Sequence, residues 1–196
     1  MLATNFRTLS TAPRLATDVC IVGAGPVGLV LSRMLTKFGV SNAVIERFAS
    51  HQDHPKAHYL SFRTCEILQD LLDDPFLDQQ IERHREWNRF LYCSTIQGEL
   101  PFAAVTHFTE KDVPSWSQFS YANPSHYSQN RLVDKLKLAE VKHNLAYCGH
   151  TQSVDGVTVQ TEEGTQIDCQ VLVGCDGVRS KVRRDIGSQM QGQHGK

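Results

Sequence analysis

The stretch Asp18-Val-Cys-Ile-Val-Gly-Ala-Gly-Pro-Val-Gly28, continued by Leu29 to Met34, decides the fold. Its apolar part, Val19–Val22, is typical of a strand that is buried on both faces of a parallel sheet. The strand ends in a G-x-G-x-x-G pattern, and the apolar spacing after it predicts a helix from about Pro26 to Phe38. Strand, glycine turn and helix together predict the first half of a βαβ unit.

Each glycine of this pattern has a physical task. Gly23 allows the tight turn out of the strand, Gly25 lets a pyrophosphate approach the backbone, and Gly28 lets the helix lie close to the sheet. The phosphates would face the positive end of the helix dipole. A second apolar strand, Ala43–Ile45, is followed by Glu46, eighteen residues after Gly28. A carboxylate at that point binds ribose hydroxyls and disfavours a 2′-phosphate, so the site favours FAD or NAD over NADP.

The composition excludes several classes of protein. The chain has 196 residues with 20 basic and 21 acidic side chains, so its charge gives no reason to expect nucleic acid as a partner. No apolar run is long enough to cross a membrane. The six cysteines include no C-x-x-C pair, which favours reduced core thiols in an intracellular protein. The histidine-rich segment 48–59 is interpreted as a solvated loop and not as a metal site.

The two ends of the chain differ from its centre. Residues 1–17 carry two arginines and several hydroxyl side chains but no acid, which is typical either of a mitochondrial transit-peptide remnant or of a disordered arm in a cytoplasmic protein. Residues 188–196 are expected to be a disordered tail. Residues 18–187 are expected to form one nucleotide-binding domain, with a partial substrate-side insertion at about 75–127.

Hydrophobic periodicity predicts the remaining elements. Residues 61–72 and 128–143 have the apolar spacing of helices, and the charged segment 79–89 is also predicted to be helical. Residues 90–105 are interpreted as two strands joined by a turn. Asp-Gly and Glu-Gly turns between alternating residues predict an antiparallel meander over 152–173. The expected fold class is therefore α/β, with a mostly parallel, Rossmann-like sheet and an antiparallel β-meander.

The last apolar strand, Val171–Val173, is followed by Gly174-Cys-Asp-Gly-Val-Arg-Ser-Lys181. A hairpin turn fits this segment poorly, because the residues after Asp176 have the pattern of a helix start. Ligands of open α/β sheets bind beyond the carboxyl ends of the strands. If this strand neighbours the first one, the Asp176 carboxylate lies near the Gly23 turn and can accept a hydrogen bond from a ribose or ribityl hydroxyl.

Taken together, these segments resemble the FAD-dependent aromatic hydroxylases of the para-hydroxybenzoate hydroxylase and phenol hydroxylase type. The resemblance spans about residues 18–187. It rests on the glycine motif with Glu46-Arg47, on Pro55–Glu66, on Ser128–Leu132, and on Val173–Arg183 with its Asp-Gly pair. One departure from the family pattern is Lys56, which stands where the family usually has arginine and keeps the charge without the planar fork.

The resemblance implies a set of FAD-binding residues. They are Gly23, Gly25 and Gly28 at the pyrophosphate, Glu46 at the adenosine ribose, Arg47 by the adenine, Arg63 and Gln129 toward the flavin and its ribityl chain, and Asp176 and Gly177 at flavin or pyrophosphate hydroxyls. It further implies a monooxygenase in which NADPH or NADH reduces FAD, and a flavin C4a-hydroperoxide hydroxylates a small aromatic substrate. The sequence identifies no catalytic acid or base.

Family members are roughly twice as long as this chain and carry a further Gly-Asp motif that it lacks. The chain is therefore expected to be a truncated N-terminal portion, with its own activity left open and with self-association through an exposed sheet edge. Two alternatives remain. One is a non-catalytic module that binds FAD or another nucleotide, and the other is an NAD-linked Rossmann oxidoreductase, against which the Asp176-Gly177 stretch argues.

Overall fold

A computed structural model describes residues 13–50, 56–72, 89–95, 97, 100–106, 118–122, 124–137, 141–189 and 191–192. The chain divides into two units, which are described separately. Unit 1 comprises residues 1–52 and 137–196, and unit 2 comprises residues 53–136. The predictions for residues 1–12, for His51 and His54, and for a helix over 79–88 fall outside the described residues.

Unit 1 is built on a four-stranded parallel sheet of order β12-β2-β3-β8. Its strands are β12 (Val171–Gly174), β2 (Val19–Val22), β3 (Asn42–Glu46) and β8 (Val141–His143). All of β2 is buried, as expected for a central parallel strand, and helix α1 (Pro26–Lys37) contacts both β2 and β3. The predicted first strand, helix and second strand are confirmed.

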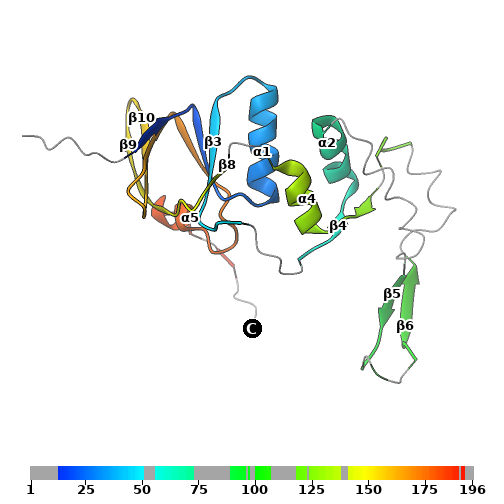
Figure 1. Cartoon of the computed structure of the whole chain (residues 1–196). Helices are drawn as coiled ribbons and strands as arrows, with labels where there is room; N and C mark the ends of the chain where they lie inside the picture. The colour runs from blue at the N-terminus through cyan, green and yellow to red at the C-terminus, as the bar shows by residue number, and fades with distance from the viewer. Residues whose placement is uncertain are drawn as a thin grey trace, which may run out of the picture. The chain divides into compact units, whose positions relative to one another are not determined.

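A second sheet, of order β1-β11-β10-β9, forms another layer of unit 1. Its strands are β1 (Arg14–Ala16), β11 (Gln166–Cys169), β10 (Gly156–Thr161) and β9 (Tyr147–Ser153), and β9 to β11 are the predicted antiparallel meander. Figure 1 shows the layers of unit 1 in the order meander, parallel sheet, α1. A core that includes Cys20, Ile45 and Ile167 joins the two sheets. The expected α/β class is confirmed.

Two segments differ from the sequence-based expectation. Residues 14–16 were assigned to the N-terminal arm, but they form β1, which pairs in parallel with β11 and adds an Arg14–Asp168 ion pair. The helix expected over 128–143 ends at Leu136, and Val141–His143 form β8 instead. β8 pairs with β3, which would otherwise be an edge strand of the parallel sheet. A continued helix could not form these backbone hydrogen bonds.

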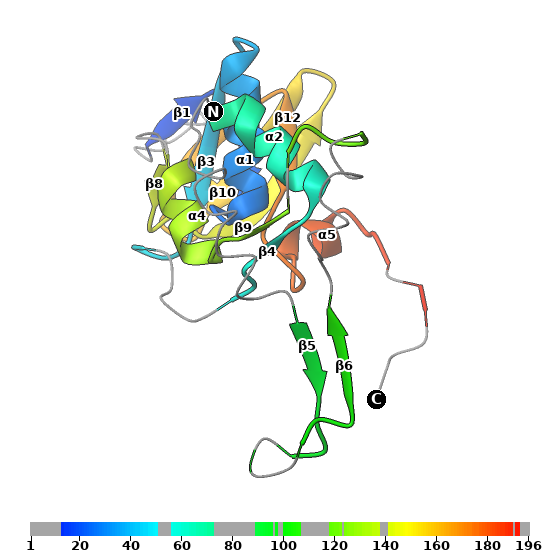
Figure 2. The ribbon, with the colours of Figure 1, turned by 90° about the vertical axis from the view of Figure 1, so that its right-hand side faces the viewer.

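The described residues of unit 2 include two helices and two pairs of short strands. The helices are α2 (Phe62–Leu72), as predicted, and α4 (Gln129–Leu136). The strand pairs are β4 (Tyr59–Leu60) with β7 (Ser125–His126), and β5 (Arg89–Tyr92) with β6 (Ala103–Thr106). The predicted β5–β6 pair lies side by side in both Figure 1 and Figure 2. Within the described residues, no helix has the length and apolar character needed to cross a membrane.

Candidate functional site

Three parallel strands end together in unit 1. Gly174, Val22 and Ile45 are Cα partners across β12, β2 and β3. Just beyond these positions, the backbone N–H of Cys175 donates to Val22 O at 2.8 Å, and that of Gly23 donates to Ile45 O at 2.8 Å. The carboxyl ends of β12 and β2 are therefore adjacent, as the sequence predicted, at the edge of the sheet where ligands of this architecture bind.

Two glycines make this convergence possible because a side chain at either position would collide with the backbone. Gly23 has a φ of +106°, and a Cβ built there would lie 2.6 Å from Cys175 O. A Cβ at Gly28 would lie 2.1 Å from Gly23 O and 3.3 Å from Cys175 Cβ. The glycine turn thus packs directly against the Cys175-Asp176 backbone, and the first turn of α1 packs against the glycine turn.

Gly25 differs from its two neighbours because open space lies in front of it. Among the described residues, no heavy atom lies within 4 Å of a Cβ built at Gly25. Gly25 is the N-cap of α1 in an extended conformation, and Pro26 starts a first turn with no acidic residue and no side-chain cap. An uncapped helix N-terminus beside open space, with backbone that a ligand can approach, fits a pyrophosphate. The residues present therefore fit the diphosphate part of a dinucleotide.

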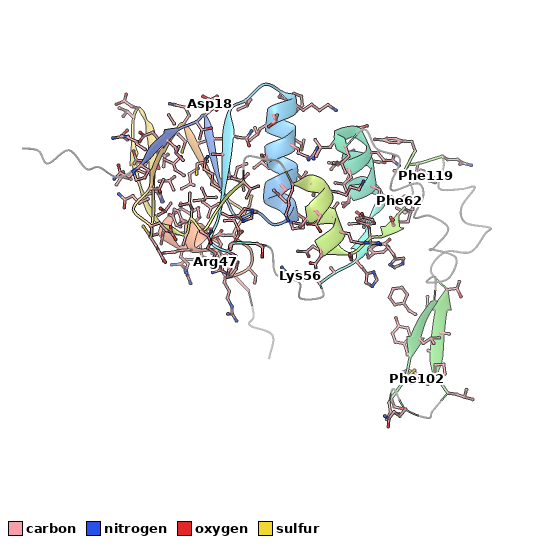
Figure 3. The ribbon with its side chains drawn as sticks, viewed as in Figure 1. Asp18, Arg47, Lys56, Phe62, Phe102 and Phe119 are labelled. Atoms are coloured by element: carbon pink, nitrogen blue, oxygen red, sulfur yellow. The ribbon has the colours of Figure 1, made fainter. Side chains whose placement is uncertain are left out.

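Glu46 lies at the end of β3 with its carboxylate against the glycine turn. Its Oε2 accepts a hydrogen bond from Ala24 N at 2.9 Å, and its Oε1 accepts one from Phe48 N at 3.1 Å. These bonds hold the carboxylate beside the turn, where the sequence predicted a ribose acceptor. The next residue, Arg47, is exposed and places its guanidinium 4.6 Å from the centre of the Phe48 ring. Figure 3 shows Arg47 at the end of unit 1 where β3 ends.

Asp176 stabilises the start of helix α5 (Lys181–Asp185). Its carboxylate accepts hydrogen bonds from Ser180 Oγ at 2.5 Å, Lys181 N at 2.6 Å and Val182 N at 3.3 Å. Burial alone would raise the pKa of Asp176, but the bonds from Ser180 and the two backbone N–H groups outweigh it and lower the pKa. Asp176 is therefore ionised, and it fixes the turn that faces Gly23. A contact with a ribose or ribityl hydroxyl stays a prediction.

Two neighbours of Asp176 complete this turn. Gly177 is exposed with a φ of +82°, a conformation that favours glycine. Ser180, which the sequence analysis did not single out, is the N-cap of α5 and accepts a hydrogen bond from Arg183 N at 2.9 Å. A serine directly before a helix was the available signal. Burial, and then the Asp176 charge, raise the pKa of the Cys175 thiol, so that thiol adds no negative charge beside a bound phosphate.

Two predicted residues, Arg63 and Gln129, belong to unit 2, and their surroundings are described within that unit alone. Arg63 is exposed on α2 and forms an ion pair with Glu66 at 3.0 Å. Gln129 begins α4, and its backbone N–H donates to Ala57 O at 3.1 Å. No cluster of three metal-ligating side chains occurs in the described part of the chain.

A hollow of about 450 Å³ lies elsewhere in unit 1. Thr17, Asp155, Asp168 and Gln170 are among its lining residues, and they lie near the amino ends of β2 and β12. This end of the parallel sheet is opposite to the glycine turn. Asp168 is already engaged by Arg14 and by Thr158 Oγ1 at 2.7 Å. The glycine turn, and not this hollow, has the features of a nucleotide site.

The fold and the glycine turn define an α/β domain of the dinucleotide-binding class. The chain belongs to the family described as FAD binding domain, whose model matches residues 16–196. It is 32% identical over 188 residues to the phenol 2-monooxygenase of Pseudomonas sp. (strain EST1001), covering 89% of this chain and 31% of that protein. It is 29% identical over 197 residues to the 2,4-dichlorophenol 6-monooxygenase of Cupriavidus pinatubonensis, covering 92% of this chain and 32% of that protein.

The fold is also that of a solved flavoenzyme. The crystal structure of the flavin-dependent monooxygenase PieE in complex with FAD and substrate matches with a TM-score of 0.74 at 23% identity, over 90% of this chain and 33% of that one. The chain therefore spans about a third of the length of these relatives, and not the half expected from its sequence. The resemblance to FAD-dependent aromatic hydroxylases is confirmed, and FAD is the cofactor of the family.

Proposed function

We propose that unit 1 binds the adenosine diphosphate part of FAD, and that the chain serves an NADPH- or NADH-dependent monooxygenase that hydroxylates a small aromatic substrate. The observation that supports this most strongly is the open space at Gly25. It lies at the uncapped N-terminus of α1, between Glu46 on one side and the Cys175-Asp176 turn on the other. A dinucleotide whose phosphates lie at that point can contact Glu46 with its ribose and can also contact the end of β12.

Each residue of the site has a task in this proposal. Gly25 and the N-terminus of α1 bind the pyrophosphate, because a backbone without Cβ and a helix dipole favour a close anionic ligand. Glu46 accepts from the adenosine ribose and disfavours a 2′-phosphate, which selects FAD over a phosphorylated dinucleotide at this position. Asp176 orders the turn opposite Gly23. Arg47 lies by the adenine.

The family resemblance implies two further residues that contact the cofactor. Gln129 at the start of α4 would approach the ribityl chain, and Arg63 on α2 would lie on the flavin side. When bound, FAD would supply the redox chemistry of such an enzyme, which is hydride acceptance from the nicotinamide cofactor and oxygen transfer to the substrate. The relatives named for phenol and 2,4-dichlorophenol support an aromatic substrate.

Reconstitution with FAD followed by desalting tests the proposal. The purified chain should retain the visible absorption of oxidised flavin. Gly25→Val should remove it, since the extended backbone of Gly25 accepts any residue but the new side chain fills the phosphate position. A matched control is Gly149→Val on β9, where a built Cβ makes only an ordinary 3.9 Å contact with Gln160. Flavin retained by Gly25→Val would remove the basis of the site.

Two alternatives give different results in the same preparation. A non-catalytic FAD-binding module would be yellow but would not oxidise NADPH or NADH in the presence of phenols. An NAD-linked oxidoreductase would be colourless and would bind NAD tightly. The Asp176-Gly177 turn favours a flavin site over an NAD-linked oxidoreductase. It places the end of β12 beside the glycine turn that follows β2, so a ligand there meets two strand ends.

Self-association through an exposed sheet edge is also proposed, and the β5–β6 pair supports it. Large apolar side chains are exposed on or beside these two strands, with Phe102 73% and Leu91 55% exposed. Among the described strands, β5 and β6 pair only with each other. A two-stranded ribbon with unpaired edges and apolar faces readily adds a further strand. Figure 3 labels Phe102 beside this strand pair.

A further inference from the structure

Strand β8 brings a fourth strand end to the edge of the sheet that carries the glycine turn. β8 pairs in parallel with β3, and its last residue, His143, is the Cα partner of Glu46. Figure 1 and Figure 2 both show β8 beside β3. Residues 144–146 connect β8 to β9. This connection therefore lies next to residues 46–48, to which the proposed function assigns the adenosine.

Three hydrogen bonds join the end of β8 and this connection to the residues that follow β3. His143 Nδ1 donates to Phe48 O at 3.0 Å; a carbonyl oxygen can only accept, so the ring nitrogen carries the proton. The backbone N–H of Asn144 donates to the same oxygen in a longer bond of 3.5 Å, and that of Leu145 donates to Glu46 O at 2.9 Å. The backbone on both sides of Arg47 is therefore held from β8.

The backbone conformation of Asn144 makes the last two of these bonds possible. Its φ is +57°, in the left-handed region, and Asn144 is the only residue other than glycine with a positive φ in the described part of the chain. Asparagine tolerates this region better than most residues. In this conformation two successive N–H groups, those of Asn144 and Leu145, point at carbonyls of residues 46–48. A residue that disfavours a left-handed conformation would turn at least one of them away.

The position of Phe48 in turn affects the side chains that the proposed function assigns to the adenosine. Phe48 N donates to Glu46 Oε1 at 3.1 Å and Ala24 N donates to Oε2 at 2.9 Å, so the carboxylate is oriented from two sides. The Phe48 ring also lies under the Arg47 guanidinium, 4.6 Å from it. Phe48, whose carbonyl His143 holds, therefore supports both the predicted ribose acceptor and the residue predicted to lie by the adenine.

We propose that His143 and Asn144 are positioning residues for the adenosine part of FAD. By holding the Phe48 carbonyl, they keep Phe48 N on the Glu46 carboxylate and its ring under Arg47, so that ribose and adenine meet side chains that are already in place. Neither residue touches the cofactor in this proposal. The inference rests on the proposed FAD binding, and it predicts that the affinity for adenosine-containing ligands depends on β8.

The first test measures the binding of ADP to the whole chain by titration calorimetry. His143→Leu removes the donor, and it should raise the dissociation constant about fivefold, the size expected for one net hydrogen bond. His143→Asn places an amide N–H where Nδ1 was, and it should keep the parent affinity. A loss of strand stability alone would give the opposite order, because asparagine is depleted in strands. Equal affinities of the two variants, or of His143→Leu and the parent, would overturn the inference.

His150→Leu is the matched control, because it makes the same change on β9, in the other sheet. The hydrogen bond of His150 Nδ1 joins it to the Tyr147 hydroxyl at 2.7 Å, within β9 itself. This variant should leave the affinity for ADP unchanged. An equal loss in His150→Leu and His143→Leu would contradict the inference, because the affinity would then follow the stability of the domain and not the position of Phe48.

The second test changes the backbone preference at Asn144. Both Asn144→Gly and Asn144→Val remove the asparagine side chain, but only glycine readily keeps the left-handed conformation. Asn144→Gly should therefore bind ADP as the parent does, while Asn144→Val should raise the dissociation constant about fivefold or more. Equal affinities of these two variants would contradict the role of the turn. Failure of the parent chain to bind ADP would instead refute the proposed function itself.

Discussion

Gly28 provides the sharpest test of how the glycine turn is built, because the structure predicts that Gly28→Ala destabilises a helix that alanine normally stabilises. Replacing glycine by alanine inside a helix contributes about 1 kcal/mol of stability. At Gly28, however, the new Cβ would lie 2.1 Å from the backbone oxygen of Gly23. That atom belongs to the turn between β2 and α1, so it cannot rotate away as the end of a side chain could.

The magnitude follows from these two opposing effects. Forcing a methyl group into packed backbone costs about 1–3 kcal/mol, and an overlap of this size belongs at the upper end. The net loss is then about 2 kcal/mol, which lowers the melting temperature of a chain of this size by about 4–8 °C. Gly25→Ala is the matched control: its Cβ enters open space in extended backbone. Alanine is the poorer N-cap but also restricts the unfolded chain, and because these effects oppose each other the stability should change by less than about 1 kcal/mol.

Thermal unfolding of the cofactor-free chain, followed by circular dichroism, measures both variants. The reasoning predicts a clear loss for Gly28→Ala and at most a small change for Gly25→Ala, while FAD binding weakens in both. A Gly28→Ala chain that melts at or above the temperature of the parent would refute the close packing of α1 on the Gly23 turn. A Gly25→Ala chain that unfolds as early as Gly28→Ala would refute the assignment of open space.

Three further predictions concern other parts of the molecule. The pKa of Asp176 is lowered in the folded state, so its contribution to stability is present above the ordinary carboxyl pKa and is lost as the pH falls through the lower native value. Asp176→Asn should therefore be less stable than the parent at pH 7. The difference between their urea midpoints should disappear as the pH falls through that acidic range. Arg14→Ala should speed hydrogen exchange at the Gln166 amide, which donates to Pro13 O, without a measurable change in melting temperature, because the Arg14–Asp168 pair is exposed. Phe102→Glu should shift any concentration-dependent oligomer toward monomer in sedimentation, whereas Val154→Glu, at an exposed turn of the meander, should not.

Local patterns in the sequence were sufficient for the elements that contain the glycine turn. Val19–Val22 has a continuous apolar run and α1 has a proline start after the G-x-G-x-x-G pattern, so both were predicted within one residue of their observed bounds. The position of Asp176 beside this turn also followed from the sequence, because an apolar strand that ends in a polar turn belongs at the ligand-binding edge of a parallel sheet.

The missed elements depend on partners that are distant in the chain. β1 forms because Arg14–Ala16 pairs with β11, and β8 forms because it pairs with the edge strand β3. Both pairings are distant in the sequence, so the local sequence pattern of neither segment predicts a strand. The apolar spacing through Val141 even favoured a continued helix. Similarly, the Tyr147–His150 contact requires a bulge, and a bulge depends on the register with β10. The sequence also did not predict that the Asp176 carboxylate would cap α5.

Titration calorimetry with ADP and with 2′-phospho-ADP, which differ only in the 2′-phosphate, tests the central claim most directly, because unit 1 is assigned to the adenosine diphosphate end of the cofactor. The account predicts that ADP binds, that its binding is lost in Gly25→Val, and that the 2′-phosphorylated nucleotide fails to bind because its phosphate meets the Glu46 carboxylate. Equal binding of the two nucleotides, or ADP binding that survives Gly25→Val, would contradict it.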